Sequence, residues 1–329
     1  SPSSYLAGSR NLVIGAGSGA AGLTVRSSTS TDGFFAFADG TTGNETYRGY
    51  IAYGHSTDSL RFATSATARL RIDSSGNMAL ATTPESWESG QFFAFQFGKG
   101  GAVYGRAAGD EDRNGFVSNC YHDSAGWKYI ASSAHSTRYD QNDGNHIWYY
   151  AGTGTADAAV SFSEAMRVDT SGRLLIGTTS SRLGGLLQVE SVGSGNGRLH
   201  SLSHNTNTSE ASVLRFVKSR GTAAGAVTAV QNDDGLGYLA FTGTDGSGNT
   251  DGAYISAEVN GTPGTNDMPT DLQFWTNSGA ASPTERLRID NQGILGVGVT
   301  PSDWGGSRKA IQFDSAGAAY VCNDSSMGI

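Results

Sequence analysis

The sequence predicts an all-β chain built from tandem antiparallel units, and three observations support this fold class. Glycine supplies 47 of the 329 residues and proline only 6, a composition that suits many tight turns between short strands. Apolar and polar residues alternate at a period of two, as on strands with one buried face. One motif also recurs along the chain, which indicates repeated short β-meander or sandwich-like units.

The motif occurs in full at 69–87 and 286–304, which align without a gap and are identical at nine of nineteen positions. A third copy at 165–179 keeps the aspartate and the glycine, and a weaker echo at 8–15 keeps neither. The three aspartates are 169 − 73 = 96 and 290 − 169 = 121 residues apart. Uneven spacing of this kind indicates domains with variable insertions rather than a solenoid of fixed period.

An aspartate and a glycine three positions apart predict a tight turn in each copy. Aspartate is favoured at the first position of a type I turn because its carboxylate accepts backbone N–H groups, and glycine is favoured at the fourth. We therefore expect a hairpin turn, and a structural rather than catalytic or calcium-binding aspartate, at three places. The pairs are Asp73 and Gly76, Asp169 and Gly172, and Asp290 and Gly293.

A short strand before each hairpin, at 60–64, 147–151 and 272–276, completes a three-stranded meander, with Ile147 aligned to Leu60. The chain then divides into the end of a preceding unit, three repeat units and the start of an incomplete unit. The third repeat unit carries a long insertion at 243–266. The respective bounds are 1–16, 17–82, 83–179, 180–300 and 301–329.

Both end units are incomplete, so we expect the native polypeptide to continue in both directions. The segment 209–220 could form either a short helix or a strand.

Charge and hydropathy exclude several classes of partner. The formal net charge of −8 and the lack of a basic run argue against nucleic acid. No apolar stretch approaches the roughly 20 residues that cross a bilayer, so we expect no membrane insertion. Cys120 and Cys322 are too few for a disulfide framework, and we expect two free structural thiols, with a long-range bridge as the alternative.

Candidate metal and catalytic residues are weak, and we expect no cofactor, no metal site and no enzyme activity. His200 and His204 have zinc-ligand spacing only if they lie on a helix. The segment 245–252 is similar to a calcium loop, but it departs from the EF-hand pattern. The acidic run 110–112 is consecutive, whereas a glycosidase needs two carboxylates held apart across a groove.

An aromatic face on 147–151 is the strongest candidate for recognition. Trp148 and Tyr150 lie on one side of this strand, and Trp127, upstream in the sequence, is a third candidate for the same aromatic face. Tryptophan and tyrosine are enriched at protein interfaces, and flat rings can also stack on sugars. We predict that this face is buried between protomers, with a glycan-binding platform as the alternative.

The sequence "LQFWT…ERLRIDNQGILGVGVTP", together with residues 119–172, resembles modules of bacteriophage tail fibres and related virion fibres. The resemblance covers about half of the chain. Ala79 and Ala81 depart from the family's sequence motif. It implies an elongated, homotrimeric, β-structured shaft or tip on the virion, assembled in the host cytoplasm. Nothing in the chain resembles the self-cleaving chaperone that often follows such modules.

We therefore predict a structural virion fibre segment that spaces or presents host-receptor-binding surfaces. Its expected partners are itself, other tail or fibre proteins, and a host surface glycan or protein. The alternatives are a tailspike-like polysaccharide depolymerase with a groove between subunits, and a bacterial surface adhesin.

Overall fold

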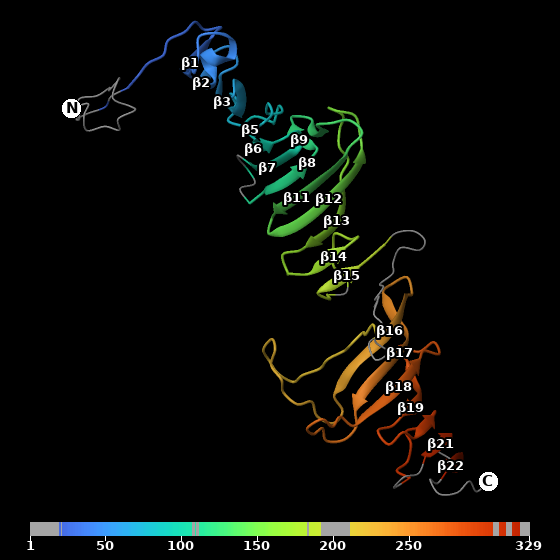
Figure 1. Cartoon of the computed structure of the whole chain (residues 1–329). Helices are drawn as coiled ribbons and strands as arrows, with labels where there is room; N and C mark the ends of the chain where they lie inside the picture. The colour runs from blue at the N-terminus through green and yellow to red at the C-terminus, as the bar shows by residue number, and fades with distance from the viewer. Residues whose placement is uncertain are drawn as a thin grey trace. The chain divides into compact units, whose positions relative to one another are not determined.

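The computed structural model describes residues 20, 22–106, 109, 112–182, 184–191, 211–304, 309–313 and 318–322. Strands dominate, and the helical element of this described part is a short 3-10 helix, η3 (Gly43–Tyr47), so the predicted all-β class is confirmed. The chain divides into two compact units, Ser1–Leu199 and His200–Ile329 (Figure 1). The finer division into five segments stays a prediction.

The first unit contains one thirteen-stranded sheet with the strand order β1 to β8 followed by β11 to β15. Neighbours pair antiparallel except β5 with β6 and β14 with β15, which are parallel. A separate hairpin is formed by β9 (Cys120–Asp123) and β10 (Gly126–Tyr129). The sheet strands are β1 (Asp32–Phe37), β2 (Gly49–Gly54), β3 (Ser59–Thr64), β4 (Thr67–Ile72), β5 (Met78–Leu80), β6 (Phe92–Phe97), β7 (Gly101–Arg106), β8 (Asn114–Ser118), β11 (His135–Asn142), β12 (Asn145–Thr153), β13 (Ser163–Val168), β14 (Leu174–Ile176) and β15 (Leu187–Val189).

The second unit contains a seven-stranded sheet in chain order, in which β20 and β21 pair parallel. Its strands are β16 (Gly235–Thr244), β17 (Asn249–Val259), β18 (Thr270–Thr276), β19 (Thr284–Ile289), β20 (Leu295–Val297), β21 (Lys309–Phe313) and β22 (Ala318–Cys322). The expected insertion at 243–266 contains β17, which pairs with strands on both sides. Residues 249–259 of this segment are therefore part of the sheet. Residues 211–220 form neither a helix nor a strand.

The repeated motif forms the hairpins β4–β5, β13–β14 and β19–β20. Their glycines have positive φ angles of 85°, 74° and 77°. In each turn the aspartate Oδ1 accepts two backbone N–H groups, for example those of Ser171 at 2.9 Å and Arg173 at 3.0 Å from Asp169. The glycine N–H donates to the aspartate carbonyl, at 2.9 Å for Gly172. The carboxylate thus satisfies backbone donors that the tight turn leaves unpaired.

A β-bulge recurs four residues before each aspartate. The register shifts at Arg69, Ala165 and Arg286, each of which is an extra residue relative to the neighbouring strand. The carbonyl of each bulge residue accepts an N–H from the residue twelve positions later, as in 81 − 69 = 12. These donors are Ala81, Gly177 and Gly298, with φ angles of 60°, 74° and 70°. The hairpin therefore has a second position that requires a left-handed backbone.

The donor in each case lies eight residues after the motif aspartate, as in 81 − 73 = 8, directly after the second strand of the hairpin. The first copy has alanine at this position where the other two have glycine. We expect Ala81→Gly to stabilise the fold by about 0.5 kcal/mol, because an L-residue in the left-handed region costs about 1 kcal/mol and the added chain freedom of glycine offsets part of this gain.

Gly298→Ala is the matched reverse change, since a Cβ at Gly298 would meet nothing within 4 Å. It is expected to destabilise the fold by about 1 kcal/mol through the backbone alone. Urea unfolding of both variants checks the pair. Changes of the same sign in the free energy of unfolding of the two variants would contradict a left-handed position common to both hairpins.

A buried glutamine follows each hairpin in the parallel-paired strand. Gln96, Gln188 and Gln312 are 0%, 9% and 5% exposed, on β6, β15 and β21. The Oε1 atom of each accepts an N–H from the connecting loop, from Glu85 at 3.0 Å in the first case. A crossover loop on a sheet must satisfy its backbone donors, and the glutamine does this once per repeat.

The core of the first unit lies on one face of its sheet. Phe92 and Tyr104 of the sheet are buried there together with Trp87, from the loop between β5 and β6, and Cys120, from β9. Burial raises the pKa of the Cys120 thiol to about 12, which keeps it protonated and unreactive at neutral pH. The Cys322 side chain lies outside the described residues.

Candidate functional site

The opposite face of the sheet is apolar, and the described residues of the first unit leave it uncovered. The strand register aligns one row of side chains across eleven neighbouring strands, from β3 to β15. We call these residues, with their counterparts in the second unit, the apolar face. The row is Leu60, Ile72, Met78, Phe95, Val103, Phe116, Tyr139, Trp148, Met166, Ile176 and Val189.

Exposure differs sharply between the two faces of the sheet. Phe95 and Phe116 in the row are 39% and 55% exposed, whereas Ala94 and Val117 beside them are both 6% exposed. Ten strand spacings of about 4.8 Å make the row roughly 48 Å long. Monomeric soluble proteins rarely expose contiguous apolar patches of this extent, so this face is unusual for a monomer.

The second unit carries an equivalent row on its own sheet. Leu239, at 45% exposure, and Phe313, at 41%, lie at its two ends. The row is Leu239, Ile255, Phe274, Leu287, Val297 and Phe313. The described residues therefore leave the same side of the repeated meander uncovered in both units.

Trp148 belongs to the apolar face, and this corrects our alignment of the meanders. Trp148, Phe62 and Phe274 each lie immediately before the bulge, so they are equivalent. The alignment of Ile147 with Leu60 was wrong by one residue. Because side chains alternate between faces, a one-residue slip moves every side chain to the other face.

The other two aromatic candidates lie in different surroundings. Tyr150 is two residues along β12 from Trp148 and is 55% exposed. Trp127, on β10, packs instead against the core cluster of the first unit and contacts Arg138. The structure therefore separates Trp127 from the surface that carries Trp148.

Arg138 is enclosed by aromatic rings on the core side of the second meander, which consists of β8 and β11–β14. Its guanidinium carbon lies 4.1 Å from the Tyr149 ring centroid, 4.7 Å from that of Trp127 and 4.8 Å from that of Phe162. The Nε atom lies 3.0 Å from a carboxylate oxygen of Asp140, which is 1% exposed. Stacking and ion pairing together hold this charge in a nearly dry site.

Strand pairing identifies the position that corresponds to Arg138 in the first meander, β1–β5, and in the third meander, β16–β20. At this position both meanders have an open site. The residue pairs that occupy the position are Tyr50 with Ala63, Arg138 with Tyr149, and Tyr254 with Trp275. In the second meander, the β9–β10 hairpin and Phe162 cover the position. In the other two, a pocket lies there.

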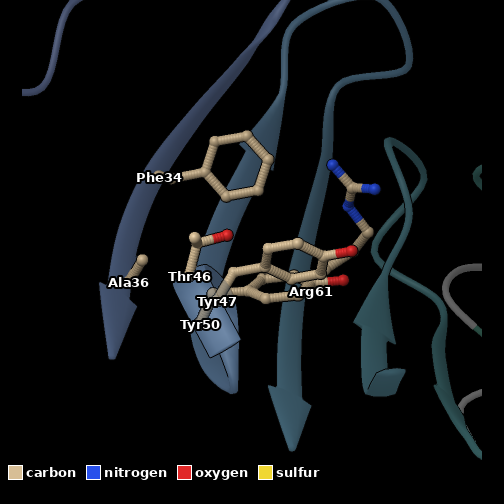
Figure 2. Close-up of a pocket in the computed structure, with 6 residues that line it drawn as sticks. All are labelled: Phe34, Ala36, Thr46, Tyr47, Tyr50 and Arg61. Carbon is tan, nitrogen blue, oxygen red and sulfur yellow. The ribbon is translucent and has the colours of Figure 1, made fainter. Parts of the chain in front are cut away.

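The pocket of the first meander is shown in Figure 2 and has a volume of about 360 Å³. Phe34 and Tyr50 meet edge to face with ring centroids 5.6 Å apart, and η3 contributes Tyr47. The tyrosine rings extend toward Arg61, whose guanidinium forms an ion pair with Asp32. This pocket is therefore aromatic and contains a cation that is already neutralised.

The third meander carries a more acidic site of about 450 Å³, which we call the aromatic trough. Tyr254 and Trp275 stack with ring centroids 5.2 Å apart, and Tyr238 lies 6.0 Å from Tyr254. Trp275 Nε1 donates to Ser256 Oγ at 3.1 Å, which fixes the indole. The residues that line the trough are Tyr238, Asp251, Tyr254, Ser256, Glu258, Gln273 and Trp275.

Sequence reasoning missed both pockets, although a signal was present. "FFAF" at 34–37 matches "YLAF" at 238–241, and Tyr-Ile at 50–51 matches Tyr-Ile at 254–255. Both pairs have the same offset, 238 − 34 = 204 and 254 − 50 = 204. The hairpins match at 290 − 73 = 217, so extra residues between the two elements hid the relation from an ungapped comparison.

The other candidates from the sequence carry no site in the described residues. His200, His204, Asp110 and Glu111 lie outside those residues. The Asp245 carboxylate accepts hydrogen bonds from Ser247, Gly248 and Thr250, which lower its pKa well below the usual range. No cluster of three or more potential metal ligands occurs in the described part of the chain. That part also contains no helix long and apolar enough to cross a membrane.

Comparison with known proteins gives limited matches. No protein-family model matches this chain, and no curated protein sequence matches it. Two solved structures of the carboxy-terminal domain of the bacteriophage T5 L-shaped tail fibre are similar to it. The one with its intramolecular chaperone domain is 17% identical, with a TM-score of 0.34, over 52% of this chain and 51% of the other. The second is 16% identical, with a TM-score of 0.35, over 59% and 80%. The chain thus spans about half the length of the first.

Proposed function

We propose that this chain is a structural segment of a virion fibre in which three copies associate through their apolar faces. The observation that carries the proposal is the uncovered row of apolar side chains across the first-unit sheet, which recurs in the second unit. An interface between copies of one chain explains why the row is continuous. A monomeric protein would leave this surface in water.

The energetic gain from covering the row is large enough to drive assembly. Burying the remaining exposed part of one such side chain contributes on the order of 1 kcal/mol. More than a dozen of these side chains in each copy exceed the cost of association. The edge strands β1, β15, β16 and β22 also need cover, which neighbouring copies can supply.

Three-fold order rests on the resemblance of the repeated motif to tail-fibre modules, and we propose it on that ground. The expected role is to space or present surfaces for a host receptor, with other tail or fibre proteins as partners and no catalytic activity. A capsule-degradation assay on the assembled chain distinguishes this role from that of a depolymerase. A bacterial surface adhesin would instead require a secretion signal in its gene.

Light scattering on the folded chain tests the assembly. We expect a mass of about three times 34.1 kDa, and thermal unfolding that depends on protein concentration. Unfolding depends on protein concentration because only the folded state forms the interface between copies. A stable folded monomer at micromolar concentration would contradict the proposal.

A further inference from the structure

We propose that the aromatic trough of the third meander binds a guanidinium group, carried by an arginine side chain of a partner. Tyr238, Tyr254 and Trp275 supply the ring surfaces, and Asp251 supplies the counter-charge. The proposal does not depend on the assembly of three copies. It rests on a comparison of the three meanders and on the charges around the trough.

The second meander already contains such a complex within one chain. There Arg138 stacks on Tyr149 and lies 3.0 Å from Asp140, and Trp127 covers it. The register makes Trp275 the counterpart of Tyr149. The counterpart of Asp140 is Ser256, so the third meander repeats the ring of this complex and takes its carboxylate from another position, Asp251.

In the third meander, no described residue fills the platform with a cation. Tyr254 takes the strand position of Arg138, and its ring lies against Trp275. The β9–β10 hairpin has no equivalent among the described strands of the second unit. The trough is consequently open at the side where Trp127 covers the second meander.

The charges around the trough are unbalanced. Asp251 and Glu258 line it, and neither forms an ion pair with a described residue. The nearby cation Arg288 is engaged by Glu285 and Asp271, at 2.7 and 2.6 Å. Burial, and next the charges of Asp251 and Glu285, raise the pKa of Tyr254, as expected where the local potential is negative. A cationic ligand relieves this imbalance, and an anionic ligand is repelled.

A guanidinium fits this site better than an ammonium or a neutral sugar does. It is planar and weakly hydrated, so it stacks on rings while it donates hydrogen bonds to a carboxylate at its edge. An ammonium is more strongly hydrated and cannot stack. A neutral sugar could contact the rings but would leave Asp251 and Glu258 without a counter-charge.

The pocket of the first meander serves as an internal contrast. Phe34 and Tyr50 are the counterparts of Tyr238 and Tyr254. Its own Arg61 is present and paired with Asp32, so an added guanidinium finds no free carboxylate there. Binding is therefore expected at the third meander and not at the first.

The test uses the full chain labelled with 5-fluorotryptophan and observed by fluorine NMR. The chain has five tryptophans, and Trp275→Phe identifies the signal of Trp275. The probe is N-acetylarginine amide, and the control ligand is N-acetylcitrulline amide, which has nearly the same shape without the charge. We expect the arginine probe to shift the Trp275 signal with a dissociation constant in the millimolar range, and the citrulline compound to leave it unchanged.

Two variants assign the charge that is responsible. Asp251→Asn is expected to weaken arginine binding about fivefold, as the loss of one exposed charge contact of roughly 1 kcal/mol implies. Asp267→Asn removes a carboxylate from a loop of the same unit outside the trough and is expected to change nothing. Higher salt should weaken binding by the unmodified chain, a result that does not depend on any variant folding.

The proposal is overturned if arginine does not shift the Trp275 signal, or if citrulline shifts it equally. It is also overturned if Asp251→Asn and Asp267→Asn weaken binding to the same extent. A shift produced by neutral oligosaccharides and not by arginine would assign the trough to glycans instead. An equal response to N-acetyllysine amide would contradict the guanidinium while retaining a cation site.

Discussion

Arg138→Met is expected to destabilise the first unit by about 3 kcal/mol, because it leaves the buried Asp140 carboxylate without its closest cation. The side chains of Arg138 and Asp140 are 8% and 1% exposed, so water cannot replace the lost partner. Tyr104 still donates to Asp140 at 2.5 Å, and Arg113 lies 3.5 Å away, which places the effect at the lower end for a broken buried pair. Methionine keeps much of the packing against the rings, so the loss reports mainly the charge.

The control is an arginine–aspartate pair of similar length on the surface. Arg48 lies 3.2 Å from Asp39, but the two side chains are 51% and 61% exposed. Arg48→Met should cost less than about 1 kcal/mol, because solvent screens the pair. Urea unfolding of the full chain measures both variants. Similar losses for the two would show that Arg138 is not held in a dry site.

Phe95→Glu is expected to abolish assembly of the proposed trimer and to leave a folded monomer. Phe95 lies inside the apolar row, between Met78 and Val103, and is 39% exposed in the single chain. A carboxylate at this position can stay hydrated in the monomer. In an interface it would be buried without a partner, which costs several kcal/mol in each copy.

Light scattering and far-ultraviolet circular dichroism check this prediction together, since the first reports mass and the second reports strand content. Thr83→Glu adds the same charge at an exposed loop position after β5 and should leave the assembly intact. A Phe95→Glu chain that still assembles would exclude the apolar face as the interface. An unfolded Phe95→Glu chain would show that the side chain supports the sheet itself.

The three meanders show one framework used in different ways on its two faces. The apolar side is alike in every repeat, as Phe62, Trp148 and Phe274 illustrate. The other side varies: it is closed around Arg138 in the second meander and open in the first and third. Common contacts between copies can thus coexist with sites of different chemistry.

The sequence by itself determined the strand-rich class and the repeated Asp-x-x-Gly turns, because these depend on local requirements. A turn glycine at positive φ, such as Gly172, leaves a mark at one position whatever the rest of the chain does. Alternation at a period of two likewise marks a strand and its two faces. Both signals are complete within a few residues, so they can be recognised without knowledge of the partner strands.

Only the tertiary structure decided the register, the bulges and the face that is covered. Alternation does not say which residue of one strand lies opposite which residue of the next, and Ile147 was therefore aligned one position away from its true place. The segment 243–266 was likewise set apart as an insertion, although pairing on both sides makes β17 part of the sheet. Burial depends on distant segments: Trp127 of the β9–β10 hairpin closes over Arg138, whereas the described part of the second unit has no counterpart of this hairpin. These features arise from contacts between residues far apart in the chain, and no short stretch of sequence contains them.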